Sequence, residues 1–240
     1  MRRISTYNES DLHDALKEYF RGTDGIKEAS IKGYSVDVLR DGRIYEIQTA
    51  SFGALKQKLS MLAPDWPISV VYPIPEVKWI IRIDEDGGVI SRRRSPKKGS
   101  GYEVFKELVY LAPLLPDPAI TIVLAFVDVE EERRQDGKGS WRRKGDSVVS
   151  RKLLSFRTTQ TLSDPEEYRL FLRLSESSPF TTADIRKNLS VSASLASRIA
   201  YFLKTTGMAE FIGKTGRMHL YRWRVETKES GLYRQWRTEN

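Results

Sequence analysis

One stretch of the sequence decides the predicted fold, Gly33-Tyr-Ser-Val-Asp37-Val-Leu-Arg-Asp-Gly42-Arg-Ile-Tyr-Glu46-Ile-Gln48. Its Asp41-Gly42 pair is a strong signal for a two-residue hairpin turn, so residues 34–40 and 43–49 are predicted to form paired strands. Side chains alternate along a strand, so Glu46 and Gln48 share one face while Ile47 points to the other. Asp37 and Glu46 then stand on neighbouring strands and can face one end of the sheet.

The segments on either side of this hairpin predict a mixed α/β core. Leu12, Leu16 and Phe20 recur at helical spacing, and Ser10 or Asn8 can cap that helix. The predicted elements around the hairpin are helices at residues 9–20 and 52–62 and strands at residues 26–33, 67–72 and 78–83. A strand–helix–strand order implies a right-handed crossover within a mixed sheet.

This order, together with Asp37, Glu46 and Gln48, resembles the metal-binding hairpin of the PD-(D/E)XK nuclease superfamily. The resemblance implies an α/β fold, a restriction-endonuclease-like mixed sheet flanked by helices. It also implies that Asp37 and Glu46 bind Mg²⁺ or Mn²⁺, that Gln48 orients the attacking water or phosphate, and that Glu28 assists. Mg²⁺ prefers oxygen ligands, and a metal ion held by carboxylates can activate water and stabilise the charged transition state of phosphodiester cleavage.

Two features of the hairpin depart from the superfamily pattern. Val36 stands where the pattern has proline, and Gln48 stands where lysine is commonest. Glutamine cannot supply the positive charge that lysine brings to the transition state, so this departure bears on activity more than on fold. Glu9 and Glu18 are alternatives to Glu28 as the further acid. The alternative to the whole site is a plain β-hairpin with surface acids.

The middle of the chain contains two basic segments. The first is a predicted loop with Arg92, Arg93, Arg94, Lys97 and Lys98, which can line a DNA channel beside the metal site or remain solvated. The predicted elements that follow are a helix at residues 102–111, a strand at 120–129, a charged helix start at 130–134 and a loop at 136–145. In that loop Trp141 precedes Arg142, Arg143 and Lys144, so it can stack on an unpaired base or anchor the loop to the core. The loop, combined with the Glu-Ile-Gln-Thr hairpin, is similar to a pattern in an uncharacterised prokaryotic protein family.

The C-terminal part, residues 156–240, is predicted to be a second domain after a nuclease-like domain at residues 1–155. Its helices at 182–189 and 193–206, followed by a Gly213–Gly216 turn, resemble a winged helix-turn-helix domain. The resemblance implies that the second helix reads bases with Ser194, Ser197 and Arg198. It further implies that Lys214 and Arg217 contact phosphates. Winged helices also serve as protein-interaction modules, so that alternative stays open.

The composition favours a polyanionic partner. Lys and Arg number 40 against 32 Asp and Glu, a formal net charge of +8, and the excess lies after residue 91. Such a balance favours nucleic acid, and DNA is the expected partner; the nuclease resemblance also allows a homodimer.

The sequence has no cysteine, which excludes disulfides and thiolate metal sites. No stretch approaches the ~20 apolar residues of a membrane span, so a cytoplasmic protein without a membrane partner is expected. His13 is predicted to be a surface or partly packed residue rather than a catalytic one.

Two functions are therefore expected. The first is a metal-dependent DNA endonuclease whose winged helix places it on the substrate. The second is a catalytically silent nuclease-like scaffold that acts as a DNA-binding or transcriptional regulatory protein.

Overall fold

The computed structural model of the protein describes residues 11–49, 51–115, 117–143 and 145–224. Its main feature is a seven-stranded sheet with the neighbour order β1-β2-β3-β4-β6-β7, in which β5 also pairs with β4. These strands are β1 (Ile26–Ile31), β2 (Tyr34–Arg40), β3 (Arg43–Ile47), β4 (Ile68–Ile83), β5 (Val89–Arg94), β6 (Ile120–Gln135) and β7 (Asp146–Leu162). β4 runs parallel to both β3 and β6, and the other pairs are antiparallel. The sheet is therefore mixed, as predicted.

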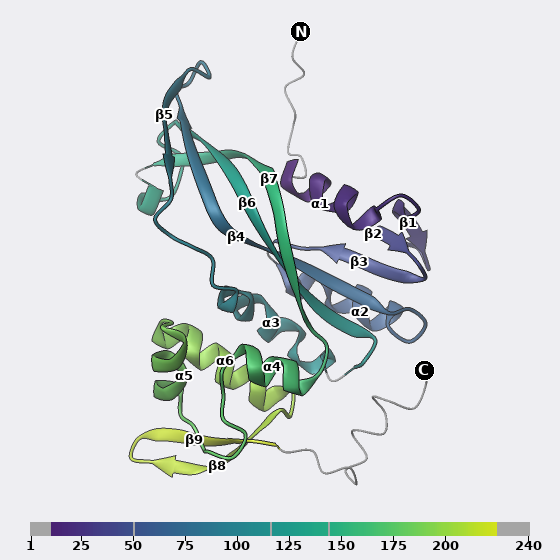
Figure 1. Ribbon diagram of the computed structural model, residues 1–240, viewed down its shortest axis with the longest axis vertical. Helices are drawn as coiled ribbons and strands as arrows, with labels where there is room; N and C mark the ends of the chain where they lie inside the picture. Colours follow the sequence, from purple (N-terminus) through teal and green to yellow (C-terminus); the bar gives the residue numbers. More distant parts are fainter. Residues whose placement is uncertain (1–10, 50, 116, 144, 225–240) are drawn as a thin grey trace.

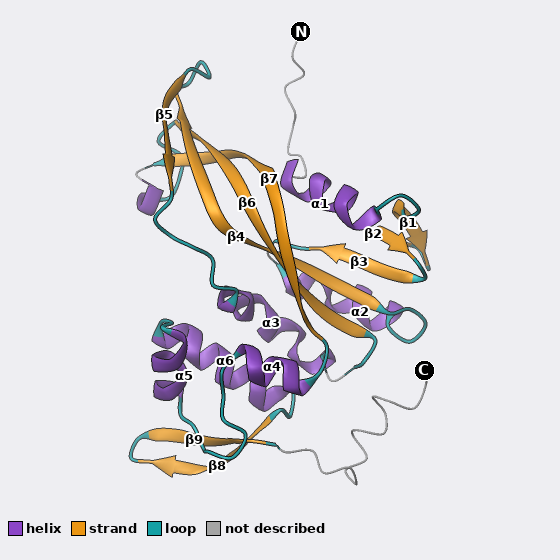
Figure 2. Ribbon diagram, in the orientation of Figure 1, coloured by secondary structure: helices purple, strands orange, loops and turns teal. Residues whose placement is uncertain are grey.

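Helices cover both faces of this sheet (Figures 1 and 2). The helices are α1 (Asp11–Arg21), α2 (Lys56–Leu62), α3 (Phe105–Leu111), α4 (Pro165–Phe171), α5 (Thr182–Leu189) and α6 (Ala193–Thr205). On one face, Leu16 of α1 belongs to a cluster with Val71 and Val127 of the sheet. On the other, α2 and α3 belong to a larger cluster that includes Val70 and Leu124. Within the described residues, no helix is long and apolar enough to cross a membrane.

β4 and β5 differ from their predicted form. The segments predicted as two strands, 67–72 and 78–83, form the single strand β4, which begins one residue later at Ile68. A bulge between Pro75 and Val77 lets the pairing with β6 continue past the prolines. Arg92–Arg94, predicted as a loop, are the last residues of β5 and pair with the outer half of β4.

β6 and β7 extend together well beyond the prediction. Residues 130–134 do not begin a helix but continue β6, because Glu131 is buried there and binds Arg133 and Arg151. Paired charges therefore replace the apolar alternation that normally indicates a strand. β7 was not predicted, since its surface is mostly half-buried or exposed and carries few apolar residues. It continues to Leu162, beyond the boundary predicted at residue 155.

The C-terminal part consists of α4, α5, α6 and a hairpin of β8 (Ala209–Thr215) and β9 (Met218–Trp223). The two helices predicted at 182–189 and 193–206 are confirmed. The rings of Phe202 in α6 and Phe105 in α3 have centroids 5.0 Å apart, and Tyr168 of α4 lies 5.4 Å from Phe202. These three residues belong to the same apolar cluster as the α2–α3 face of the sheet. The C-terminal helices therefore share a core with the sheet.

Candidate active site and nucleic-acid surfaces

Asp37 lies where β2 and β3 separate. Their pairing begins at the hairpin turn and reaches Val38–Tyr45. Beyond that pair, Asp37 Oδ2 accepts a 2.7 Å hydrogen bond from the Ile47 amide. The carboxylate thus takes the place of a backbone carbonyl between the two strands. This is a local consequence of the hairpin sequence, because Asp37 and Ile47 stand on opposite strands just past the last paired residues.

Two side chains of α1 reach this carboxylate. Lys17 Nζ lies 3.1 Å from Asp37 Oδ1, and His13 Nε2 lies 3.4 Å from Asp37 Oδ2. His13 Nε2 also lies 2.7 Å from the Ile47 carbonyl, which can only accept, so this nitrogen carries a proton. Burial raises the pKa of Asp37, but hydrogen bonds from His13 and the Ile47 amide outweigh burial and leave the pKa below its ordinary value. Asp37 is therefore a carboxylate at neutral pH.

Glu46 lies close to Asp37 but in a different environment. It is 3% exposed, and Lys58 Nζ of α2 lies 2.5 Å from its Oε1. Burial raises the pKa of Glu46 to about 7, against the opposing effect of Lys58, and the charge of Asp37 adds to the rise. Within the described residues Oε1 has no hydrogen bond of suitable angle, although the ion-pair distance to Lys58 is short. The pair Asp37–Glu46 therefore combines one ionised acid with one that titrates near neutral pH.

The other two predicted residues are placed differently. Glu28 forms an ion pair with Lys17 and accepts a 3.0 Å hydrogen bond from Ser35 Oγ. Lys17 therefore bridges Glu28 and Asp37, although the Glu28 side chain is 55% exposed. The backbone N–H of Gln48 donates to the Val71 carbonyl at 2.9 Å, which extends the β3–β4 pairing. The Gln48 side chain is half-buried.

Three members of this cluster, His13, Lys17 and Lys58, were not among the predicted site residues. His13 is partly packed, as predicted, but it is packed against Asp37. A signal existed for Lys17, because His13 and Lys17 are four residues apart and therefore lie on one face of the helix. Lys17 is only 2% exposed, and a buried lysine requires an acidic partner. The sequence offers no comparable signal for Lys58.

The donor chemistry of the pair suits a hard divalent cation. Asp37 and Glu46 offer carboxylate oxygens, the ligand type that Mg²⁺ and Mn²⁺ prefer, and Glu46 Oε1 lacks a well-aligned hydrogen bond. Across the described ranges, however, no three His, Asp or Glu side chains are grouped so that they could hold a metal ion. In this arrangement, lysines neutralise both acids.

The predicted basic residues of the middle segment lie on the extended part of the sheet. Arg92 is placed over the Trp79 ring, 4.3 Å from its centroid, and binds Glu130. Lys97 lies 3.4 Å from Glu103, and both Lys97 and Lys98 are exposed. The predicted stretch around Trp141 lies between the ends of β6 and β7, at the end of the same extension. There Arg82 of β4 binds Asp146 of β7 through two hydrogen bonds of 2.8 and 3.0 Å.

Within that stretch, Trp141 is 83% exposed and Arg143 donates to the Asp146 carbonyl. The side chain of Arg142 and all of Lys144 lie outside the described residues. Arg92–Arg94 and the Trp141 segment therefore both lie on the sheet extension, the former on β5 and the latter between β6 and β7.

The predicted reader residues lie on α6 and on the β8–β9 hairpin. Ser194 and Ser197 are exposed, and Ser197 Oγ donates to the Ala193 carbonyl. Arg198 donates to the Lys106 carbonyl of α3 at 3.3 Å, so its guanidinium is directed at the sheet-bearing part of the molecule. Lys214 and Arg217 are exposed at the hairpin turn.

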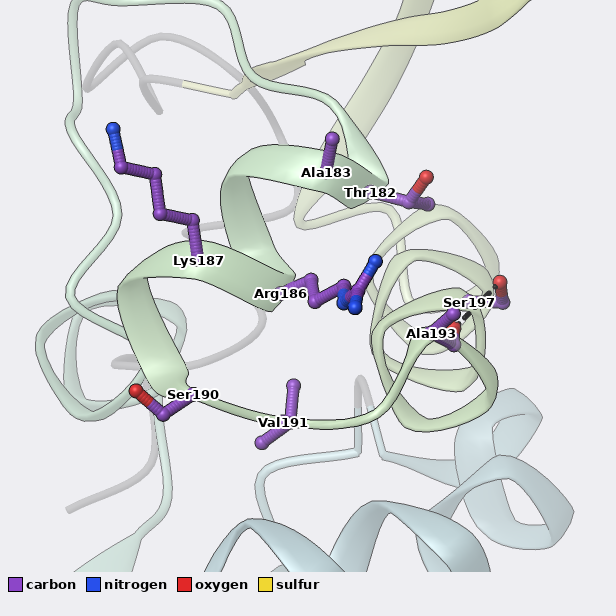
Figure 3. A pocket seen from close by; sticks show the side chains of 8 residues that line it. All are labelled: Thr182, Ala183, Arg186, Lys187, Ser190, Val191, Ala193 and Ser197. Atoms are coloured by element: carbon purple, nitrogen blue, oxygen red, sulfur yellow. Dashed lines mark hydrogen bonds between the residues drawn. The ribbon is translucent and has the colours of Figure 1, made fainter.

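An open depression of about 530 Å³ lies between α5 and the start of α6 (Figure 3). The Arg186 side chain is directed toward α6, and Lys187 also lines the depression (Figure 3). Both side chains are exposed. The sequence gives no signal for Arg186 as a contact, because the direction of its side chain depends on how α5 and α6 pack.

Comparison with known proteins identifies relatives without an assigned activity. The domain of unknown function DUF8091 matches residues 10–163, the segment that contains α1 and the whole large sheet. The chain is also similar to an uncharacterized protein of Treponema pallidum (strain Nichols), with 34% identity over 227 residues, 91% of this chain and 87% of the relative. No solved structure matches the chain. The chain thus belongs to the DUF8091 family.

Proposed function

We propose that the protein is a metal-dependent nuclease that cleaves phosphodiester bonds in DNA, with Asp37 and Glu46 at its catalytic centre. The observation that carries this proposal is the proximity of these two acids on the neighbouring strands β2 and β3, where the charge of Asp37 acts on Glu46. Lys17 and Lys58 reach them from helices on opposite faces of the sheet. A pair of acids held beside fixed cations suits a reaction that brings a phosphate anion to a site where negative charge grows.

Each residue has a role in this proposal. Asp37 and Glu46 would hold Mg²⁺ or Mn²⁺, which as a Lewis acid would polarise the phosphate and lower the pKa of a bound water. Without a metal ion, burial raises the pKa of Glu46 to about 7, and a bound cation would favour its carboxylate form. Lys58 beside Glu46 supplies the positive charge that Gln48 lacks. Lys17 holds Asp37 in place through the contact it also makes with Glu28.

For the C-terminal part we propose a winged-helix DNA reader. The order α5, α6 and the β8–β9 hairpin supports this proposal, as does the exposure of Ser194, Ser197, Lys214 and Arg217. A second helix that enters the major groove and a basic wing that contacts phosphate would place the substrate. Arg198 would act within the protein, through its contact with α3.

The test is cleavage of plasmid DNA by the full chain with Mg²⁺ or Mn²⁺. Asp37→Asn and Glu46→Gln should each reduce the rate on the order of 10²-fold or more, as expected when a transition-state contact is lost. Glu85→Gln, on the exposed turn between β4 and β5, is the matched control and should cut normally. Equal cleavage by all four proteins would remove the proposed site.

A second candidate is a silent nuclease-like scaffold that binds DNA without cutting it. Its specific support is that Lys17 and Lys58 already neutralise the two acids, as in a structural ion-pair cluster. Calorimetric titration of Mn²⁺ into the full chain with DNA present separates the two candidates. A nuclease binds the ion in the wild type and loses it in Asp37→Asn, whereas a scaffold gives no specific heat in either protein.

A further inference from the structure

A small pocket lies beside β4, next to the point where β3 ends. Its volume is about 170 Å³, and its lining consists of Tyr72, Pro73, Ile74, Pro75, Lys78, Lys97, Gly99, Gly101 and Glu103. The Gln48 amide binds the Val71 carbonyl, one residue before the lining begins. The pocket therefore opens beside the end of β3, where Glu46 and Gln48 stand.

One wall of this pocket is the loop that follows β5. The Ser95 amide donates to the Lys78 carbonyl at 2.7 Å, and the Gly99 amide donates to the Pro75 carbonyl at 2.9 Å. A side chain at Gly99 would place its Cβ 2.7 Å from Ile74 Cγ2 and 2.8 Å from the Pro75 oxygen. Only glycine permits this close approach of the loop to the strand. The wall is consequently fixed by backbone contacts rather than by mobile side chains.

Four basic side chains and three acids lie around the pocket, since Glu107 acts on Tyr72 in addition to Glu103 and Glu131. Lys78 shares the buried carboxylate of Glu131 with Arg133 and Arg151, so three cations surround one acid. Lys97 contributes a further cation and lies 3.4 Å from Glu103, the acid in the lining. Lys78 is partly buried, and burial lowers its pKa against the effect of Glu131. An anion in the pocket would stabilise the charged form of Lys78.

The remaining lining is apolar and aromatic. Ile74 is buried, and the Tyr72 ring packs edge-to-face on Phe52 with centroids 5.7 Å apart. The volume is well below the roughly 300–1,000 Å³ of pockets that hold drug-sized ligands. The space therefore suits one flat group beside one anion, and a nucleotide would fit only with its sugar outside the pocket.

We propose that this pocket binds a single nucleotide, with its phosphate at Lys78 and Lys97 and its base against Tyr72, Ile74 and Pro75. The inference rests on the proposed function for its substrate, since a nucleotide here would be an unpaired residue of the strand held at Asp37 and Glu46. Apolar and aromatic surfaces bind bases of any sequence, and lysine binds phosphate as a point charge.

The test is calorimetric titration of the full chain with 5′-dAMP, deoxyadenosine and inorganic phosphate, with EDTA present to prevent cleavage. The nucleotide should bind the wild type about tenfold or more tightly than either fragment, because charged hydrogen bonds and base contact add together. Lys97→Ala should weaken nucleotide binding about tenfold. Lys98→Ala is the matched control, since Lys98 is the adjacent exposed lysine and does not line the pocket, and it should bind as the wild type does.

Three results would overturn the inference: absence of nucleotide binding, equal affinity of Lys97→Ala and Lys98→Ala, or equal affinity of the wild type for nucleotide and inorganic phosphate. Cleavage of an oligonucleotide by the same proteins separates this inference from the proposed function. Cleavage without 5′-dAMP binding removes the pocket and retains the nuclease. If the wild type binds 5′-dAMP but cuts no DNA, and Lys97→Ala loses the binding, the pocket is retained and the nuclease is excluded.

Discussion

The pH dependence of stability gives a sharp test of how Glu46 is held. Burial raises the pKa of Glu46 from 4.5 to about 7, so between these values the folded protein keeps a proton that the unfolded chain has released. Stability falls with rising pH wherever the folded state binds more protons. Glu46 therefore contributes stability that is fully present below pH 4.5 and is lost as the pH rises through about 7.

The size of this effect follows from the shift. One pKa unit corresponds to about 1.4 kcal/mol, so the rise from 4.5 to about 7 amounts to about 3 kcal/mol. Glu46→Gln keeps the shape of the neutral acid and cannot ionise. The variant should therefore gain about 3 kcal/mol over the wild type between pH 4.5 and pH 8.5, or roughly 6–12 °C in Tm for a chain of this size.

The assay is thermal unfolding of the wild type, Glu46→Gln and Glu85→Gln over this pH range. The difference between the wild type and Glu46→Gln should grow from pH 4.5 to about 7 and then level off. Glu85→Gln, on its exposed turn, should follow the wild type. Loss of the Lys58 contact offsets part of the gain, so the change of the difference with pH is the measured quantity. A difference that stays constant from pH 4.5 to 8.5 would refute the buried, neutral-at-low-pH assignment of Glu46.

Three further perturbations test the rest of the structure. Lys17→Met removes a 2%-exposed cation shared by Glu28 and Asp37, so urea unfolding should show a loss of about 3 kcal/mol, and a loss below 0.5 kcal/mol would mean that the ion pairs contribute little. Phe202→Ala should cost about 3–5 kcal/mol and lower one common unfolding transition, because its ring packs on Phe105 and Tyr168; separate transitions for the two parts would contradict the shared core. Lys214→Ala and Arg217→Ala should each reduce the salt slope of DNA binding by about one, measured by gel shift over a salt series, and slopes equal to the wild type would exclude the hairpin as a phosphate contact.

The hairpin of the candidate site could be predicted because its signals are local. The Asp41-Gly42 turn and the alternation at Glu46-Ile47-Gln48 depend only on neighbouring residues. The cations could not be predicted in the same way. Lys58 meets Glu46 only because α2 packs over the sheet after the β3–β4 crossover, and Lys17 meets Asp37 only because α1 covers the opposite face.

The extended half of the sheet was missed for a different physical reason. Strands are recognised by apolar alternation, but Glu131 of β6 is buried with Arg133 and Arg151 as partners. In the sequence, charged residues that pair across strands cannot be distinguished from charged residues on a solvent-exposed segment. The same effect hid β7, and it led to the prediction of a helix start at residues 130–134.

The rate of plasmid nicking by the wild type and by Asp37→Asn, each with Mn²⁺ and with EDTA, tests the central claim most directly. We expect nicking by the wild type with Mn²⁺ and none with EDTA. The rate of Asp37→Asn should be reduced on the order of 10²-fold or more. Asp37→Asn that nicks at the wild-type rate would contradict the assignment of Asp37, as would wild-type nicking that is unaffected by EDTA. A folded, DNA-binding wild type that never nicks with Mn²⁺ would contradict the nuclease itself and leave the silent scaffold.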